Sequence, residues 1–167
     1  MDRDPVRVLF VCLGNICRSP LAEGVLRHLL VERGLDGAYE VDSAGTGAWH
    51  VGEPPDRRSA EVALRNGVRL GGAARQVKPS DLHDFDFVIA MDRDNLRALE
   101  AMKERHGGRA RVHLLREFDP DPGDRQVPDP YYGGPSGFDD VYRLVRRSLE
   151  AFLDRLEEDD GERPEGA

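Results

Sequence analysis

The segment that most constrains the fold is a short turn, residues 12–20 (CLGNICRSP), which joins an apolar run to a helical pattern. Residues 6–11 are rich in the β-branched and aromatic residues typical of a buried strand, and apolar residues recur at helical spacing over residues 20–30. The turn therefore connects a strand to a helix. The helix N-terminus presents unpaired backbone N–H groups and a partial positive charge to the turn, so the sequence predicts an anion-binding loop there.

Length and composition indicate an ordinary globular protein. A chain of 167 residues is expected to form one domain and to remove about 70% of its unfolded surface from water. Hydrophobic residues make up 39% and charged residues 34%, and no apolar stretch reaches the roughly 20 residues that cross a bilayer. The first apolar run is already the predicted strand rather than a secretory leader. We therefore expect a cytoplasmic protein with no membrane partner.

Charge and cysteine content exclude other classes. The net charge of −8 argues against nucleic acid as a partner, because phosphate-backbone binding needs a basic face. An anionic ligand must then be attracted by groups in the loop itself. Cys12 and Cys17 both lie in the turn and read as reactive thiols rather than a disulfide framework. The five histidines show no metal-ligand spacing, and no metal is expected.

Strand-like and helix-like segments alternate along the chain. Further strands are predicted at residues 39–44, 86–91 and 111–115, and further helices at residues 56–66, 92–106 and 138–156. Alternation predicts a single α/β domain, a doubly wound, four-stranded parallel twisted sheet with helices on both faces and a ligand at the carboxyl ends of its strands. We place this domain at residues 1–157 and an acidic flexible tail at 158–167.

The residue types in the turn predict nucleophilic chemistry on a phosphate. The field that attracts an anion also favours a thiolate, so Cys12 is the expected nucleophile. Arg18 can bind two phosphate oxygens with its planar fork. Gly14 lets the backbone approach the anion, and Asn15 tolerates a left-handed conformation. Ser19 is placed to donate its hydroxyl to the cysteine sulfur.

CLGNICRSP, with its Cys-x5-Arg-Ser pattern near the N-terminus, resembles the low-molecular-weight protein tyrosine phosphatases. A second segment, Asp129-Pro-Tyr-Tyr-Gly133, is similar to the general-acid loop of that family. Shorter matches lie at residues 42–46, 74–76, 91–92 and 95–96, so the resemblance covers roughly residues 6–156.

The resemblance implies a phosphotyrosine phosphatase I-like fold and hydrolysis of phosphotyrosine and aryl phosphate monoesters through a cysteinyl-phosphate, with no cofactor. The implied catalytic residues are Cys12, Arg18 and Asp129, the last acting as general acid and then as base. It further implies a tyrosine-phosphorylated protein as partner, a loop that binds phosphate, sulfate or vanadate, and a monomer or weak dimer. The implied substrate-binding residues are Leu13, Gly14, Asn15, Ile16, Cys17, Ser19, Trp49, Tyr131 and Tyr132, the last two flanking the entrance opposite Trp49.

Asn15, Ser19 and Ser43 are expected from the family pattern to form a hydrogen-bond network that supports the loop. One departure stands out: relatives place a histidine beside the loop asparagine, whereas this chain has Gly72. Cys17 has two open interpretations, inert packing or a reversible disulfide with Cys12 that protects the nucleophile from over-oxidation.

Three other functions fit parts of the pattern. A protein-arginine phosphatase of the same fold is permitted by the resemblance, but its members carry threonine where this chain has Ile16. A thioredoxin-coupled arsenate reductase shares the loop but needs a further cysteine pair, and no cysteine follows Cys17. A non-catalytic phosphate-binding module would lack the nucleophile or the acid, and both are present.

Overall fold

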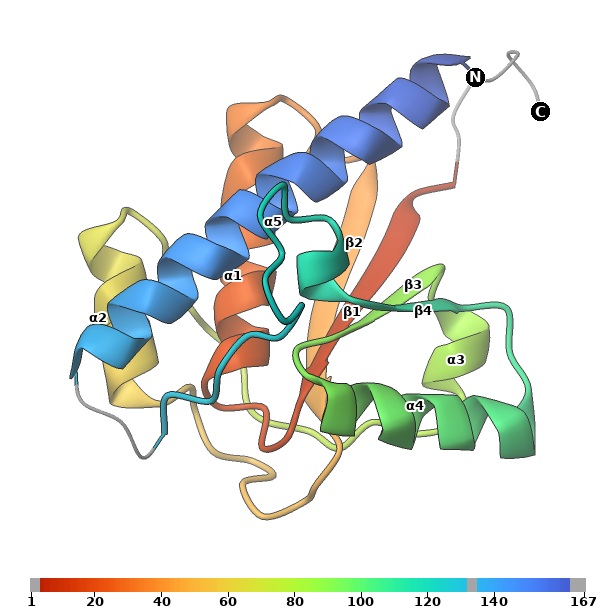
Figure 1. The fold of residues 1–167 in the computed structure, drawn as a ribbon, viewed down its shortest axis with the longest axis horizontal. Coiled ribbons are helices and arrows are strands. Elements are labelled where there is room, and N and C mark those ends of the chain that lie inside the picture. Colours follow the sequence, from red (N-terminus) through yellow and green to blue (C-terminus); the bar gives the residue numbers. More distant parts are fainter. Residues whose placement is uncertain (1–3, 132–134, 163–167) are drawn as a thin grey trace.

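The computed structural model of the protein describes residues 4–131 and 135–162 (Figure 1). Tyr132, which the resemblance assigns to the substrate site, lies outside the described residues, as does the end of the predicted tail, 163–167.

Four parallel strands form one sheet. They are β1 (Val6–Cys12), β2 (Tyr39–Gly45), β3 (Phe87–Ala90) and β4 (Arg111–Leu114), in the spatial order β2-β1-β3-β4 (Figure 1). Val8 in β1 is paired with Val41 on one side and Phe87 on the other. The four-stranded parallel sheet predicted from the alternating pattern is confirmed.

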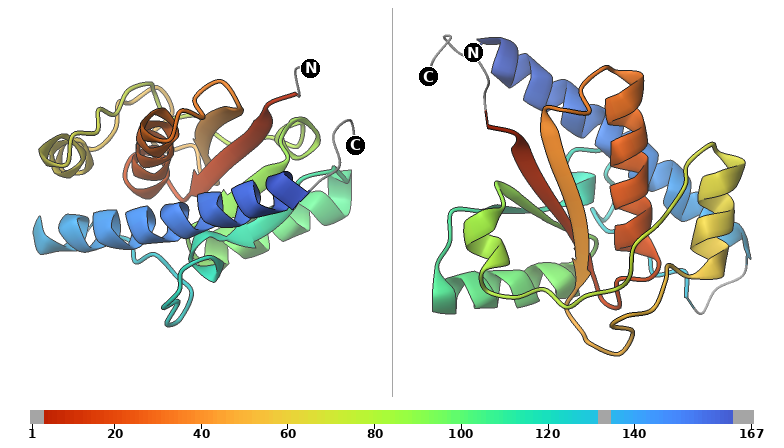
Figure 2. Two further views of the ribbon diagram at one scale, coloured as in Figure 1. Left: turned by 90° about the horizontal axis from the view of Figure 1, so that it is seen from above. Right: turned by 180° about the vertical axis from the view of Figure 1, so that it is seen from behind.

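Helices cover both faces of the sheet (Figure 2). They are α1 (Arg18–Glu32), α2 (Arg57–Arg65), α3 (Asp81–Asp84), α4 (Arg93–His106), the 3₁₀ helix η1 (Leu115–Glu117) and α5 (Pro135–Glu162). Successive residues of β1 point to opposite faces. Val8 and Phe10 pack in the core beneath α1 and α5, whereas Leu9 and Val11 pack against α3 and α4.

Apart from shifts of one residue at the ends of several elements, the structure differs from the sequence prediction in α5 and in two short helices. α5 begins at Pro135 rather than residue 138 and continues to Glu162, so residues 158–162 are helical although the sequence predicts a flexible tail there. Glu is a good helix former and no strong helix breaker precedes Gly161, which explains the extension. α3 and η1 were missed because one helical turn carries too few residues for a periodic pattern.

The topology fixes where a ligand can sit. β1 lies in the middle of the sheet, and the chain leaves it toward β2 by way of α1 but leaves β3 toward β4 by way of α4. Strand order therefore reverses between β1 and β3, and such switch points form a crevice at the carboxyl ends of the strands. Cys12 is the last residue of β1, so the turn that follows it lies in that crevice. Within residues 4–131 and 135–162, no helix has the length and apolar character needed to span a membrane.

Candidate active site

The loop between β1 and α1, residues 12–18, is fastened to its surroundings through its carbonyl oxygens. Four of these oxygens accept hydrogen bonds from neighbouring segments. The donor and acceptor pairs are Thr46 N to Cys12 O (2.9 Å), Gly47 N to Leu13 O (2.9 Å), Asp56 N to Ile16 O (2.7 Å) and Ser59 Oγ to Cys17 O (2.9 Å). Because the C=O and N–H of a trans peptide point in opposite directions, the following N–H groups are turned toward the inside of the loop.

Two backbone positions allow the loop to close. Asn15 has φ of 57°, the left-handed conformation that the sequence predicted for it. Gly45, at the end of β2, lies so close that a Cβ there would be 2.8 Å from the Leu13 carbonyl oxygen. Arg18 then begins α1, so the inward N–H groups adjoin a helix N-terminus. This arrangement suits a tetrahedral oxyanion.

Cys12 begins the loop and is buried, with 2% of the residue exposed. Ser19 Oγ is 3.0 Å from Sγ, so the contact expected between these two side chains is present. Asn15 Nδ2 donates to Ser19 Oγ at 2.8 Å. Ser19 accepts from Asn15, and the sulfur at 3.0 Å is nearer to its hydroxyl than the other acceptor, the Ala44 carbonyl at 3.4 Å, so donation to the sulfur is available to stabilise a thiolate.

The expected network behind the loop is present, and it extends further than the sequence suggested. Asn15 Nδ2 also contacts Ser43 Oγ at 3.0 Å, and Ser43 donates to Glu23 Oε1 at 2.6 Å. Asn15 Oδ1 accepts the backbone N–H of Arg75 at 3.0 Å. Gly72 has φ of +80°, and no heavy atom of the described residues lies within 4 Å of a Cβ built there. Glu23 and the Arg75 backbone therefore complete the network without a side chain at position 72.

Glu23 was missed by the sequence reasoning. It lies one helical turn after Ser19 on α1, so both side chains are on the same face of the helix. This spacing is the sequence signal that could have identified Glu23 as part of the network. Burial raises the pKa of the Glu23 carboxyl, and the hydrogen bond from Ser43 and the charge of Arg27 partly offset that effect. Arg27 Nη1 lies 2.7 Å from the carboxylate, so the outer end of the network is an ion pair.

Arg18 is held at the loop rim by three groups from other segments. Its side chain is 2% exposed; Nη1 donates to Asp92 Oδ2 at 2.6 Å and to the Val127 carbonyl at 3.0 Å. Its Nη2 lies 3.5 Å from Asp129 Oδ2. Burial alone would lower the pKa of Arg18, but the neighbouring Cys12, Asp92 and Asp129 outweigh it and raise the pKa. The guanidinium is therefore a permanent cation with a fixed orientation.

Asp92 has two roles, of which the sequence predicted only the start of a helix. Its Oδ1 accepts the Asn95 N–H at 2.8 Å and caps α4, while its Oδ2 binds Arg18. The missed signal was position: Asp92 follows β3 at the switch point, where a doubly wound sheet gathers functional side chains. Its carboxylate connects the two central strands at the site.

The residues just before Asp129 are held in place by two hydrogen bonds. Val127 N donates to the Met91 carbonyl at 2.8 Å, and Arg116 Nη1 donates to the Gln126 carbonyl at 2.8 Å. Arg116 is in turn held by the buried carboxylate of Asp119. The Asp129 carboxyl is 41% exposed at the rim, and its Oδ1 accepts the Tyr131 N–H at 3.0 Å.

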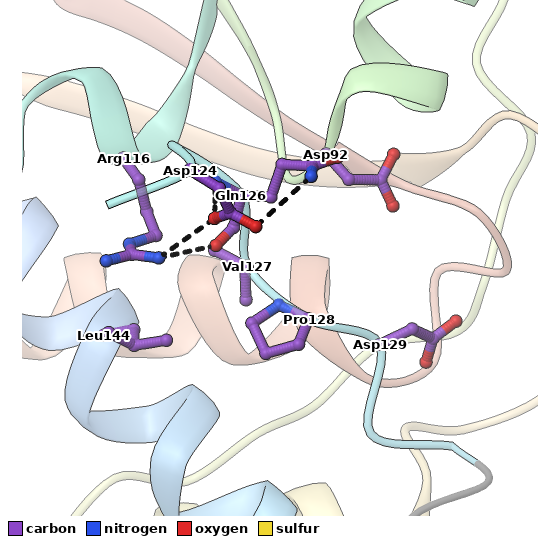
Figure 3. A pocket seen from close by; sticks show the side chains of 8 residues that line it. All are labelled: Asp92, Arg116, Asp124, Gln126, Val127, Pro128, Asp129 and Leu144. Atoms are coloured by element: carbon purple, nitrogen blue, oxygen red, sulfur yellow. Dashed lines mark hydrogen bonds and ion pairs between the residues drawn. The ribbon is translucent and has the colours of Figure 1, made fainter. Parts of the chain in front are cut away.

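A cavity of about 480 Å³ lies beside this segment (Figure 3). Asp92 and Asp129 stand toward one end of it and Arg116 and Leu144 toward the other (Figure 3). No residue of the loop 12–18 lines the cavity, so it is a separate hollow that shares two carboxylates with the site. Its lining residues are Asp92, Arg116, Asp124, Gln126, Val127, Pro128, Asp129 and Leu144.

Aromatic and apolar side chains surround the mouth of the loop. Tyr131 is half-buried, and the His50 ring centroid lies 6.2 Å from the Tyr131 ring. Trp49 is 73% exposed and its ring covers Gly47, where a Cβ would be 1.8 Å from a ring carbon. Trp49 thus rests on its own loop, and His50 is the ring next to Tyr131. The sequence analysis assigns no site role to His50. Leu13, 45% exposed, adds apolar surface.

Comparison with known proteins agrees with this geometry. Residues 7–162 match the family model described as low molecular weight phosphotyrosine protein phosphatase. A protein of that name from Schizosaccharomyces pombe is 48% identical over 149 residues, which span 89% of this chain and 95% of the relative. The crystal structure of YfkJ from Bacillus subtilis has a TM-score of 0.88 at 39% identity and covers 95% of this chain and 99% of its own. A Drosophila arginine phosphatase has a TM-score of 0.86 at 37% identity, over 90% of this chain and 97% of its own. The chain belongs to the low molecular weight phosphotyrosine protein phosphatase family.

Proposed function

We propose that this protein hydrolyses phosphotyrosine and other aryl phosphate monoesters in two steps, with Cys12 as nucleophile. The observation that carries the proposal is the bridging position of Arg18. One nitrogen of its guanidinium is fixed by Asp92 at 2.6 Å, and the other lies 3.5 Å from Asp129 at the rim of the Cys12 loop. Nucleophile, phosphate-binding cation and carboxyl group thus face one small volume.

In the first step the Cys12 thiolate attacks phosphorus, and the bond from phosphorus to the phenolic oxygen breaks. Asp129 in its acid form gives its proton to the departing oxygen. The inward N–H groups and Arg18 stabilise the charge that spreads over the three equatorial oxygens. In the second step Asp129 takes a proton from water, the water oxygen attacks phosphorus, the S–P bond breaks and inorganic phosphate leaves. Ser19 stabilises the sulfur as it becomes a thiolate again.

The shape of the mouth supports an aryl substrate. Cys12 is 2% exposed, while His50 lies against Gly14 of the loop and its ring neighbours that of Tyr131. An aromatic ring stacked there places its phosphate at the required depth, whereas the shorter phosphoserine would not bring its phosphorus to the sulfur. Tyr132 remains a proposed second wall.

A comparison of three substrates tests the proposal. With chelator present, the purified protein should hydrolyse phosphotyrosine and be inhibited by vanadate. Phosphoarginine and arsenate should be turned over far more slowly. Faster turnover of phosphoarginine would assign the chain to the arginine-phosphatase alternative, which its 37% identity to the Drosophila arginine phosphatase favours and Ile16 opposes. A requirement for a divalent ion would contradict the mechanism.

Replacing the general acid should give a loss that depends on the leaving group. We expect Asp129→Asn to lower kcat for phosphotyrosine by about 10²-fold or more, because general acid catalysis contributes roughly that much. An ester with a strongly acidic phenol needs no proton, so its kcat should fall much less. Steady-state kinetics with phenols of graded acidity measure the difference. Equal losses across the series would assign proton donation to another group.

Cys17 provides a test of redox protection. Burial, and then the charges of Asp56 and Cys12, raises the pKa of Cys17 to about 12, so its thiol is protonated at neutral pH. If peroxide converts Cys12 to a sulfenic acid, deprotonated Cys17 can attack that sulfur and expel hydroxide to form a disulfide. We expect dithiothreitol to restore less activity to peroxide-treated Cys17→Ser than to the parent, and closure to quicken as pH rises. Equal recovery would leave Cys17 as packing only.

A further inference from the structure

Helix α2, with its cap residue Asp56, contacts the Cys12 loop on one side and the start of α5 on the other. On the loop side, Asp56 N donates to the Ile16 carbonyl at 2.7 Å, and Ser59 Oγ donates to the Cys17 carbonyl at 2.9 Å. On the other side, α2 lies beside the first turns of α5 (Figures 1 and 2), and Arg65 pairs with Asp139 at 2.8 Å. Arg58, between these contacts, faces both sides.

The guanidinium of Arg58 has a fixed plane. Its Nε donates to Asp56 Oδ1 at 3.2 Å and its Nη2 to Asp56 Oδ2 at 3.1 Å, a two-point contact with a carboxylate whose side chain is 13% exposed. Asp56 Oδ1 also accepts the Arg58 backbone N–H at 2.8 Å, which caps α2. A planar fork held at two points has little freedom to turn. Arg58 is therefore a rigid extension of the residue that binds Ile16.

The same guanidinium lies against two aromatic rings. Arg58 Cζ is 5.4 Å from the centroid of the Tyr131 ring and 4.6 Å from that of Phe138, which is 2% exposed in the first turn of α5. Both distances are within the roughly 6 Å over which a cation is attracted to a ring face. Tyr131 in turn donates its backbone N–H to Asp129. A continuous path of contacts thus joins Ile16 to Asp129.

We propose that Arg58 is a positioning residue that sets the distance of Tyr131, and through it Asp129, from the Cys12 loop. The inference rests on the proposed function and adds a specificity device to it. Loss of Arg58 leaves the loop amides and Arg18 in place, so binding of a bare phosphate is unaffected. Recognition of an aryl group, and proton transfer from Asp129, are weakened because both depend on the Tyr131 segment.

The test compares Arg58→Gln with Arg57→Gln. Arg57 is adjacent, 91% exposed and paired with Glu61 on the same helix, so it controls for loss of a positive charge from α2. Calorimetry measures the Kd of inorganic phosphate and of benzylphosphonate. We expect Arg58→Gln to weaken benzylphosphonate about three- to tenfold, the range that one aromatic contact contributes, and to leave phosphate within about twofold. Arg57→Gln should change neither Kd.

Two further variants establish that Arg58 acts through Tyr131. In a Tyr131→Leu background, Arg58→Gln should have no added effect on benzylphosphonate. Arg58→Lys keeps the charge without the two-point contact, so its loss should be intermediate. The proposal would be overturned if Arg58→Gln weakened the binding of phosphate and benzylphosphonate equally, or if its two Kd values matched those of Arg57→Gln. These binding measurements need no turnover. The proposed function is tested separately, and it fails if the parent protein does not hydrolyse aryl phosphates.

Discussion

Cys12→Ser should abolish turnover of phosphotyrosine while leaving the binding of phosphate intact. A serine hydroxyl is a far weaker nucleophile than a thiolate at neutral pH, and Asp129 is the one carboxyl group the mechanism provides, already used for the leaving group. Loss of a covalent nucleophile costs on the order of 10⁶-fold in kcat elsewhere, so we expect the rate to fall by at least about 10⁴-fold. Single-turnover assays at high enzyme concentration measure the residual activity.

The binding half of this prediction is the more informative. Because the thiolate repels a phosphate dianion, its replacement by a neutral hydroxyl should leave the Kd of phosphate unchanged or lower it. Serine is nearly isosteric with cysteine, and Ser19 can still contact it. Calorimetry with inorganic phosphate therefore separates loss of chemistry from loss of the loop. Activity within tenfold of the parent would show that Cys12 is not the nucleophile.

The first half of the site could be predicted because it is local. Cys12, Asn15, Arg18 and Ser19 lie on one loop, so their spacing and residue types specify both a strand-to-helix turn and its anion-binding chemistry. The left-handed backbone of Asn15 and the contact between Ser19 and the sulfur are present in the structure. The parallel sheet followed equally from the alternation of strands and helices.

The second half depends on contacts between distant segments. Arg18 and Asp92 are 74 positions apart and Arg18 and Val127 are 109 apart, and a periodic pattern carries no information about which carboxylate meets which cation. The sequence therefore identifies Asp92 only as a helix start within a family match, and assigns no role to Glu23 or Arg58. The resemblance implies that Trp49 forms one wall of the substrate entrance. The close approach of its ring to Gly47, which the sequence does not reveal, shows that the ring rests on its own loop.

Arg18→Lys should produce the second large loss although it preserves the charge. A lysine ammonium cannot span from Asp92 to Asp129 and contact the Val127 carbonyl as well, so it gives up the two-point binding of equatorial phosphate oxygens. Arginines that stabilise such transition states contribute about 10³- to 10⁵-fold to kcat. We expect kcat/KM to fall within that range, with weaker binding of inorganic phosphate. Arg97→Lys, a 72% exposed residue on α4, is the matched control and should be unchanged.

Asp92→Asn tests what the negative charge of Asp92 contributes beside Arg18. An asparagine keeps the shape of Asp92 but has one acceptor oxygen in place of two, so it can accept from Arg18 or cap α4 through the Asn95 N–H but not both, and one negative charge near the phosphate disappears. Removing that charge should strengthen phosphate binding, whereas the weaker neutral contact should let the guanidinium move and slow turnover modestly. Asp92→Asn should therefore lower both the phosphate Kd and kcat relative to the parent, whereas Arg18→Lys should raise the Kd and lower kcat. If Asp92→Asn instead weakens phosphate binding as much as Arg18→Lys does, Asp92 acts through the fold of α4 rather than through the guanidinium.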